Sequence, residues 1–331
     1  MKSIGIIGSG SWGTALGVLL CGNATRVVLW GRENQVVETI NSRHENPDYL
    51  PGVALPPALT ATTRLEDLSG SDAVFIVVPS RAVRDVAARV AAVPLAPNVP
   101  LISCMKGIEN RTGLRMSELL AEAMPGRPVA VLSGPNHAEE IARCRPAAAV
   151  IGCGDPGIGR RLQEAVTLPW FRAYTSEDLV GIEWGAAVKN VFAIASGLAG
   201  GLGLGDNARA ALVTRGLAEM IRLGTAMGGR PETFQGLSGV GDLVVTCYSE
   251  HSRNNRVGQA LGRGQSLDQV LAGMTMVAEG VPNTESIYHA ARRTGVRTPI
   301  IDTVYAVLYQ GLSPREGLRG LFARDPRPEA E

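Results

Sequence analysis

The sequence has very few lysines. Of its 32 lysines and arginines only Lys2, Lys106 and Lys189 are lysines, which leaves 29 arginines. An arginine keeps its proton near neutral pH, whereas a lysine that is out of water or beside another cation can lose it. The retained lysines are therefore better than average candidates for proton transfer.

Patterns typical of metal or nucleic-acid binding are also missing. The five cysteines are scattered, with no Cys-x-x-Cys pair and no histidine at ligand spacing, so we expect reduced thiols and no metal site. The formal net charge is only +1, which argues against a nucleic-acid-binding surface or an anionic membrane surface.

Long apolar runs are absent as well. Residues 3–8 already form a strand-like run, and neither an extended apolar stretch nor a small-residue cleavage site precedes it. We find no later segment with the uninterrupted apolar length needed to cross a bilayer. We therefore expect a cytoplasmic protein without membrane insertion.

The chain is long enough for two domains, which we expect at 1–176 and 177–331. In the first domain, short apolar runs alternate with helical stretches, as in a doubly wound (Rossmann-like) parallel sheet with helices on both faces. We expect an α/β fold here and an all-α C-terminal domain after it. The expected strands are 3–7, 26–30, 73–78, 101–104, 129–132 and 147–151; the clearest helices are 180–196 and 209–227. We interpret 197–206 as a flexible glycine-rich connection and 323–331 as a frayed tail.

A glycine-rich segment predicts a dinucleotide site. Gly8-Ser9-Gly10-Ser11-Trp12-Gly13 follows the first expected strand and opens a helix, which is the context that this motif requires. Gly8 would make the tight turn, Gly10 would let the backbone approach a pyrophosphate, and Gly13 would allow close packing of helix and sheet. The pyrophosphate would then lie at the helix N-terminus.

The choice between NADH and NADPH stays open. The second expected strand ends at Trp30-Gly31-Arg32-Glu33. An acid alone at this place would bind the ribose 2′-hydroxyl, whereas an arginine suits a 2′-phosphate. Arg32 favours NADPH and Glu33 keeps NADH open, and a solvated turn residue explains Arg32 equally well.

Two lysines lie in segments that suit ketone chemistry. Lys189 follows Gly181 and Gly185 on a helix, where small residues would leave room for a substrate or for the other domain. Reduction of a ketone needs a proton donor at the carbonyl oxygen, and an ammonium supplies both proton and charge. Lys106 follows an expected strand, at the edge where ligands of open α/β sheets bind. A surface lysine on an amphipathic helix is the alternative for Lys189.

Three further segments carry candidate binding residues. Gly134-Pro135-Asn136 ends a strand and could bring backbone close to a ligand, although a plain turn explains it too. Ser252-Arg253-Asn254 precedes a helix, so that Ser252 can cap it while free N–H groups and Arg253 receive an anion. Asp242, which follows Gly239 and Gly241, would face a substrate hydroxyl or Lys189. His137 and His251 have no triad or metal spacing that sets them apart.

Together these segments resemble the bacterial NAD(P)-dependent glycerol-3-phosphate dehydrogenases. The resemblance covers nearly the whole chain in order, and several of its motifs are specific to that family. Its motifs are Gly8–Gly13 with Thr14-Ala15-Leu16, Lys106-Gly107, Gly134-Pro135, Ala187-Val188-Lys189-Asn190, Gly239-Val240-Gly241-Asp242-Leu243, Ser252-Arg253-Asn254 and Met276-Val277-Ala278-Glu279-Gly280-Val281.

The resemblance implies a role for each of these positions. Lys189 would be the proton acceptor and donor, and Lys106 would contact both cofactor and substrate. The implied substrate ligands are Lys106, Gly134, Asn136, Lys189, Asp242, Ser252, Arg253 and Asn254. The implied cofactor contacts are Gly8, Gly10, Ser11, Trp12, Gly13, Arg32, Tyr49, Lys106, Ala138, Arg253, Val277 and Glu279. Asn136 stands where a Ser or Thr is usual in that family, and its amide can still bond a hydroxyl or phosphate.

The activity implied is reversible NAD(P)H-dependent reduction of dihydroxyacetone phosphate to sn-glycerol 3-phosphate, which supplies phospholipid synthesis, by a homodimer. A β-hydroxyacid dehydrogenase is the nearest alternative, but there an asparagine is expected one turn after the lysine, where this chain has Ala193. A non-catalytic redox sensor that acts on DNA would need a basic recognition element, which the even charge balance does not offer.

Overall fold

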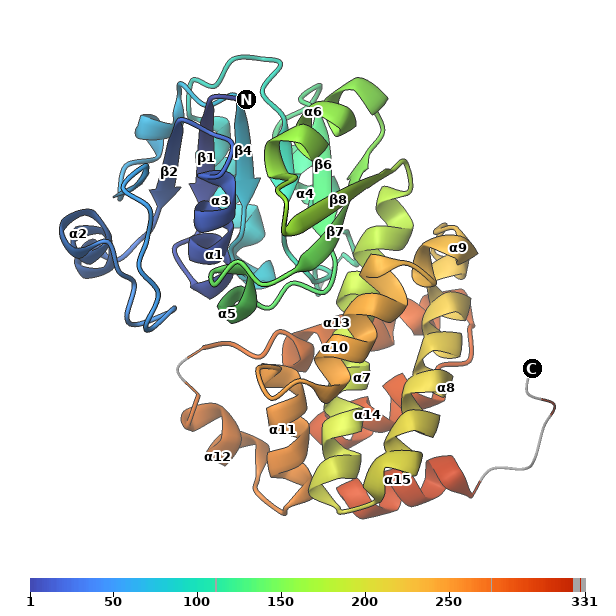
Figure 1. Ribbon diagram of the computed structural model, residues 1–331. Helices are drawn as coiled ribbons and strands as arrows, with labels where there is room; N and C mark the ends of the chain where they lie inside the picture. The colour runs from blue at the N-terminus through green and yellow to red at the C-terminus, as the bar shows by residue number, and fades with distance from the viewer. Residues whose placement is uncertain (111, 275, 324–327, 329–331) are drawn as a thin grey trace.

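The computed structural model describes residues 1–331 apart from 111, 275, 324–327 and 329–331 (Figure 1). The N-terminal part contains one eight-stranded sheet in the order β3-β2-β1-β4-β5-β6-β7-β8. Its strands are β1 Ser3–Ile7, β2 Arg26–Trp30, β3 Leu59–Thr62, β4 Ala73–Ile76, β5 Leu101–Ser103, β6 Val129–Ser133, β7 Ala147–Cys153 and β8 Phe171–Ser176. The strand order reverses beside β1, so the expected doubly wound sheet is confirmed.

Two features of the sheet differ from expectation. β6 and β7 run antiparallel, because the chain returns between them with only the four-residue helix α5 (Ala138–Ile141) and no crossover helix. The edge strands β3 and β8 were not expected at all. Both alternate buried and exposed residues, whereas the strands found from the sequence were continuous apolar runs typical of the sheet interior.

Helices cover both faces of the sheet. They are α1 Ser11–Leu20, α2 Asn34–Arg43, α3 Val83–Ala91, α4 Met116–Ala123, α5 and α6 Pro156–Val166, with short 3₁₀ turns η1 Leu65–Leu68 and η2 Ser80–Ala82. Alternate residues of β2 enter different cores: Val27 and Leu29 pack with α1 on one face, and Val28 and Trp30 pack with α3 on the other. The sheet therefore excludes water from both sides.

The rest of the chain is helical, as expected. Its elements are α7 Leu179–Gly201, α8 Gly205–Ala226, α9 Pro231–Phe234, the π-helical turn η3 Leu237–Gly241, α10 Asp242–Tyr248, α11 Arg253–Gly262, α12 Leu267–Ala272, α13 Gly280–Thr294, α14 Pro299–Tyr309 and α15 Pro314–Phe322. The central helix α7 follows β8 and packs against α8, α10, α11 and α13. The carboxyl ends of β1, β2 and β4 point toward this helical part (Figure 1).

The flexible connection expected at 197–206 is too long, because only residues 202–204 join the two helices. α7 continues to Gly201 and α8 begins at Gly205. A Cβ on Gly197 would lie 2.1 Å from the carbonyl oxygen of Asn255, and one on Gly258 would lie 2.1 Å from that of Ile194. Together with Gly201 and Gly262, which meet the other helix in the same way, these residues form a glycine interface at which the backbones of α7 and α11 touch.

Helix α7 is also long and apolar enough on average to cross a bilayer, which we did not expect of any segment. However, 89% of its most apolar window is buried inside the protein, as in the core helix of a globular domain. The expected tail at 323–331 lies outside the described residues, apart from Ala323 and Pro328.

Candidate active site

The glycine-rich loop lies between β1 and α1 and has the geometry of a phosphate cradle. Gly8 has φ +121°, and a Cβ on Gly13 would lie 1.8 Å from the Gly8 carbonyl oxygen, so both positions require glycine. A Cβ on Gly10 would meet no atom within 4 Å. The loop is thus closed on the protein side and open at Gly10, where the N-terminus of α1 begins.

A segment from the helical part reaches this loop. The Ser11 hydroxyl lies 3.2 Å from the sulfur of Met276. Arg253 donates from Nη1 to the carbonyl oxygen of Val277 over 2.8 Å. Glu279 accepts hydrogen bonds from the backbone N–H of Ser80 at 3.2 Å and from its hydroxyl at 2.5 Å. The structure therefore brings residues 276–279, which include the sequence candidates Val277 and Glu279, into contact with Ser11 of the loop, with Ser80 and with Arg253.

The other expected cofactor residues surround the same loop. Trp12 is half-buried and packs on the core beneath α1, and Ala138 is the buried first residue of α5, which lies against α1. Arg32 is exposed just beyond β2. Tyr49 accepts from the Ser11 hydroxyl at its carbonyl oxygen over 2.6 Å and donates from its own hydroxyl to Glu33 over 2.7 Å.

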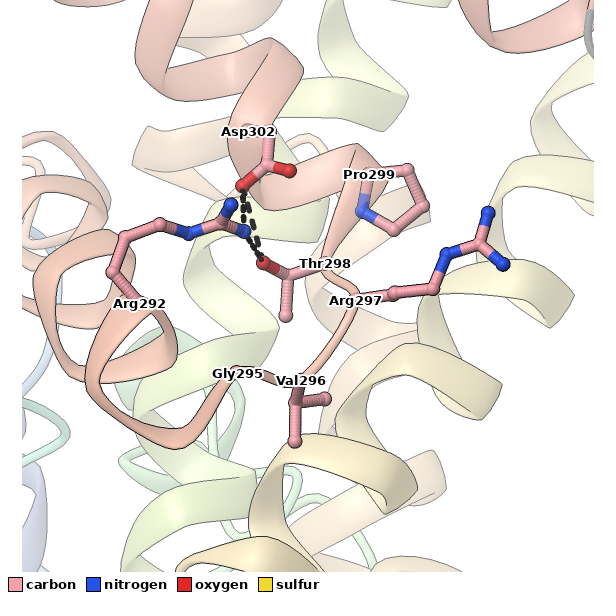
Figure 2. A pocket seen from close by; sticks show the side chains of 7 residues that line it. All are labelled: Arg292, Gly295, Val296, Arg297, Thr298, Pro299 and Asp302. Carbon is pink, nitrogen blue, oxygen red and sulfur yellow. Dashed lines mark hydrogen bonds and ion pairs between the residues drawn. The ribbon is translucent and has the colours of Figure 1, made fainter.

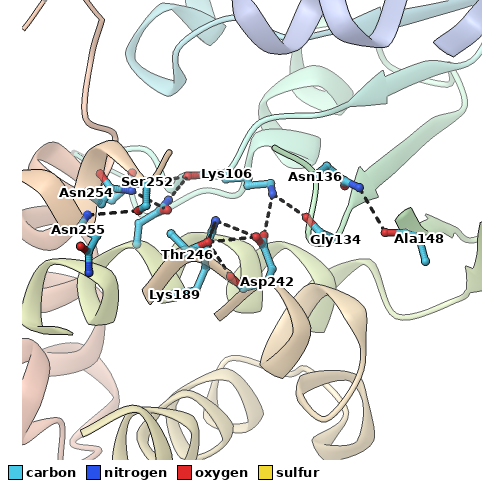
Figure 3. A network of polar contacts seen from close by, with 12 residues as sticks. Lys106, Gly134, Asn136, Ala148, Lys189, Asp242, Thr246, Ser252, Asn254 and Asn255 are labelled. Carbon is cyan, nitrogen blue, oxygen red and sulfur yellow. Dashed lines mark hydrogen bonds and ion pairs between the residues drawn. The ribbon is translucent and has the colours of Figure 1, made fainter. Parts of the chain in front are cut away.

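The two candidate lysines meet at one carboxylate (Figure 3). Lys189 Nζ lies 2.9 Å from Asp242 Oδ1, and Lys106 Nζ lies 2.6 Å from Asp242 Oδ2. Lys106 also donates to the carbonyl oxygen of Gly134 over 2.9 Å, and Lys189 donates to the Thr246 hydroxyl over 2.6 Å. The side chains of Lys189 and Asp242 are 7% and 2% exposed, so this cluster is almost free of solvent.

Burial sets the protonation of the cluster. It lowers the pKa of Lys189 to about 8; Asp242 opposes this shift and Lys106 adds to it. Burial alone would raise the pKa of Asp242, but the two ammonium groups outweigh it and hold that pKa below its usual range. Lys189 therefore exchanges its proton near physiological pH beside a carboxylate that stays charged.

The glycines upstream of Lys189 have a different use from the one expected. A Cβ on Gly185 would lie 2.9 Å from the carbonyl oxygen of Ser238, and Gly181 packs against Asp178 and Thr233. The space beside Gly181 and Gly185 is therefore filled by residues of the helical part, which leaves no room there for a substrate. This close approach brings η3, and Asp242 after it, to Lys189.

Amide side chains hold Lys106 in place. The Lys106 carbonyl oxygen accepts from Asn283 Nδ2 at 2.7 Å and from Asn190 Nδ2 at 3.2 Å. Asn254 donates to Asn190 over 2.9 Å and accepts from the N–H of Gly280. Asn254 is thus bonded at both ends of its amide within the protein, which links α11 to α7 and α13.

The remaining expected substrate residues lie around the cluster. Ser252 caps α11 by accepting from the N–H of Asn255, as the sequence suggested, and Arg253 follows it. Asn136 lies two residues beyond Gly134 and donates to the carbonyl oxygen of Ala148 over 3.2 Å. Figure 3 shows Ser252 and Asn136 on either side of Lys106, Lys189 and Asp242.

Comparisons with known proteins agree with this geometry. Residues 3–158 match the family described as the NAD-dependent glycerol-3-phosphate dehydrogenase N-terminus, and residues 178–319 match its C-terminus.

The chain belongs to this family.

Its similarity to individual members spans the full length. The chain is 49% identical over 329 residues to the glycerol-3-phosphate dehydrogenase [NAD(P)+] of Streptomyces griseus, covering 98% of this chain and 97% of that one. It is 49% identical over 334 residues to that of Thermobifida fusca, covering 99% of each. The crystal structure of glycerol-3-phosphate dehydrogenase from Coxiella burnetii superposes with a TM-score of 0.94 at 36% identity, covering 98% of this chain and 99% of that one.

Sequence reasoning missed Thr246, a polar neighbour of the site, and set aside His137, which is another. Thr246 lies one helical turn after Asp242 on α10, a spacing that could have identified it. His137 lies next to the expected Asn136, with its ring centroid 5.7 Å from that of His251. Burial lowers the pKa of His137, with further contributions from Lys189 and Lys106, which places the ring within the field of the cluster.

A cavity of about 180 Å³ lies away from this site and is lined by residues 292, 295–299 and 302 (Figure 2). It is at the opposite end of α13 from Gly280, and 15 residues of helix separate the two by roughly 20 Å. Arg292 is bonded there to Thr298 and Asp302. Among the described residues, no group of three or more His, Cys, Asp or Glu side chains is placed to hold a metal ion.

Proposed function

We propose that this protein is an sn-glycerol-3-phosphate dehydrogenase, which reversibly reduces dihydroxyacetone phosphate with NADH or NADPH. The observation that carries the proposal is the buried pair of Lys189 and Asp242 beside Lys106, in a protein whose helical part also contacts the glycine-rich loop through Met276. Membership of the family supports the same reaction.

Lys189 is the catalytic residue in this proposal. The bound dinucleotide supplies the hydride for the carbonyl carbon. Lys189 donates its proton to the carbonyl oxygen, and its pKa of about 8 suits a group that must give and regain a proton near neutral pH. Asp242 orients Lys189, and the Lys106 ammonium stabilises the negative charge that develops on oxygen.

The substrate would lie between the two parts of the chain. The N-terminus of α11, with Ser252, Arg253 and Asn254, receives the phosphate, because free N–H groups and a guanidinium favour an anion. Gly134, Asn136, Lys106 and Asp242 border the opposite side. Asn254 borders the proposed phosphate site through its place at the start of α11. Its amide side chain is already hydrogen-bonded to α7 and α13.

The residues around the glycine-rich loop fit a dinucleotide. Gly8 and Gly13 close the loop, and the open space at Gly10 leads to the N-terminus of α1 for a pyrophosphate. The remaining proposed contacts are Ser11, Trp12, Arg32, Tyr49, Lys106, Ala138, Arg253, Val277 and Glu279. We propose Arg32 as the residue that accepts a 2′-phosphate.

Other parts of the proposal concern the protein as a whole. The reaction supplies glycerophospholipid synthesis, with reduction as the functional direction. The domain boundary falls between residues 176 and 177, after β8 and before α7. We propose a homodimer in the cytoplasm, and light scattering on the purified protein tests the dimer.

An absorbance assay tests the reaction. Purified protein is mixed with NADPH, and separately with NADH, and oxidation is followed after addition of dihydroxyacetone phosphate, dihydroxyacetone or a 3-oxo acid. We expect oxidation only with the phosphorylated ketone. Oxidation only with the oxo acid would move the protein to the β-hydroxyacid dehydrogenases, and silence with every substrate would favour a dinucleotide sensor.

A matched pair of variants tests the catalytic residue. Lys189→Ala should reduce kcat by at least about 10³-fold, because it removes the proton donor and its charge. Its dissociation constant for the dinucleotide should stay near the wild-type value. Lys2→Ala removes an exposed lysine before β1, at the end of that strand opposite the glycine-rich loop, and should retain full activity. Near-wild-type turnover in Lys189→Ala would exclude this role.

A further inference from the structure

A hydrogen bond joins Tyr49 to Glu33, the residue next to Arg32. The Tyr49 hydroxyl donates to Glu33 Oε1 over 2.7 Å, and this bond raises the pKa of Tyr49. The Tyr49 backbone is itself fixed, because its carbonyl oxygen accepts from the hydroxyl of Ser11 in the glycine-rich loop. Tyr49 thus connects the loop to Glu33.

Glu33 occupies the position at which an acid decides cofactor choice. It follows Gly13 by 33 − 13 = 20 residues and lies three residues beyond β2. In dinucleotide-binding folds, an acid about 20 residues after the glycine motif bonds the ribose 2′-hydroxyl, which NADPH lacks. Glu33 begins α2 as its N-cap residue, yet its side chain makes no capping bond there.

Arg32 is in the opposite state. Like Glu33 it is exposed, but its guanidinium makes no hydrogen bond or ion pair with any part of the chain that the structure describes. The acid that would select NADH is therefore held by the protein, while the adjacent cation that would select NADPH is free to move. This contrast between neighbours is what a preference for NADPH requires.

We propose that Tyr49 is a positioning residue for cofactor selectivity, which holds the Glu33 carboxylate away from the ribose 2′-hydroxyl and leaves the 2′-position to Arg32. The proposal deepens the proposed function and rests on it for the identity of the dinucleotide site. Tyr49 acts through Glu33 here, so its effect must depend on the presence of that carboxylate.

Equilibrium binding of NADH and NADPH, measured without substrate by quenching of tryptophan fluorescence, tests this role. In Tyr49→Phe the released carboxylate can bond the 2′-hydroxyl, so the ratio of the NADH to the NADPH dissociation constant should fall by about 10-fold. Phenylalanine keeps the packing of the ring on the domain core. An unchanged ratio, or an equal loss of affinity for both dinucleotides, would overturn the proposal.

Two further variants separate this route from a direct contact. Glu33→Gln alone should leave NADH affinity within about twofold, since the carboxylate is held away from the ribose; a larger loss would show that Glu33 already binds it. Adding Tyr49→Phe to Glu33→Gln should no longer change the ratio. If the full shift persists there, the Tyr49 hydroxyl sets selectivity through its own contact with the dinucleotide and not through Glu33, and the proposal is wrong.

A control guards against a general effect of removing a tyrosine hydroxyl. Tyr174→Phe changes an exposed residue on β8, at the opposite edge of the sheet from β2 and β3, and should alter neither dissociation constant. Failure of the wild-type protein to bind either dinucleotide would contradict the proposed function as a whole. Wild-type binding without the Tyr49 effect would contradict only the present proposal.

Discussion

Two glycine-rich regions of this molecule use glycine for opposite purposes. In the loop of residues 8–13, the missing side chain of Gly10 leaves open space at the N-terminus of α1. In the glycine interface between α7 and α11, the space is filled by the backbone of the other helix. The comparison teaches that glycine spacing alone does not tell a ligand site from a packing site. What distinguishes the loop is the strand before it.

The glycine interface nevertheless serves the active site. α7 carries Lys189, and the N-terminus of α11 carries Ser252 and Arg253. Because the two backbones touch, the distance between the proposed proton donor and the proposed phosphate site is fixed by contact between main chains. A rigid pair of helices is well suited to hold groups in reacting geometry.

The largest effect should come from breaking the glycine interface. In Gly258→Ala the new Cβ would lie 2.1 Å from the Ile194 carbonyl oxygen, so the helices must separate. We expect the free energy of unfolding to fall by about 3 kcal/mol or more, with a large loss of activity because Lys189 moves. Denaturant unfolding measures the loss. Gly320→Ala, at an exposed site on α15 with no atom within 4 Å, should be neutral or stabilising; an equal loss in both would refute the packing argument.

A smaller and different effect is expected at the open glycine. Gly10 has φ −71° and ψ −176°, which alanine adopts freely, and its Cβ would contact nothing. Gly10→Ala should therefore unfold like the wild type, while its affinity for NADH and NADPH falls by about 10-fold or more, because the methyl group occupies the pyrophosphate position. Fluorescence titration reports the affinity. Loss of stability without loss of binding would reverse the distinction between the two regions.

Near physiological pH, the pH dependence should be the most modest of the three effects. Burial beside the packed helices lowers the pKa of Lys189 from 10.5 to about 8. Ketone reduction needs the protonated form, so kcat/KM for reduction should fall above pH 8, by up to about tenfold per pH unit. Oxidation of glycerol 3-phosphate needs the neutral form and should rise through the same range. A reduction rate that stays constant to pH 9.5 would place the proton donor elsewhere.

Much of the fold was predictable because it depends on local pattern. Continuous apolar runs identified the interior strands, and the strand-glycine-helix order identified the dinucleotide loop. The edge strands β3 and β8 were missed because buried and exposed residues alternate along them. The C-terminal end of α7 was missed because its glycines have low helix propensity. Only the tertiary contact with α11 compensates for that low propensity.

The sequence allowed us to predict which residues belong to the candidate site, but not which of them contact one another. The scarcity of lysine directed attention to Lys106 and Lys189, and the structure places both on Asp242. The bond between Tyr49 and Glu33 could not be foreseen, because it joins residues from a loop and a helix start that only folding brings together. The proximity of His137 and His251 arises in the same way, from opposite parts of the chain.

Because Asp242 is shared by Lys106 and Lys189, the net charge of these three side chains changes during the proposed reaction. Two ammonium groups and one carboxylate carry a formal charge of +1 before reaction, which attracts a doubly charged phosphate ester. On the proposed role of Lys189, proton transfer to the product leaves the cluster neutral. Its attraction for the ester is then weakest at the moment the product has formed, so the same step that completes the chemistry also favours release.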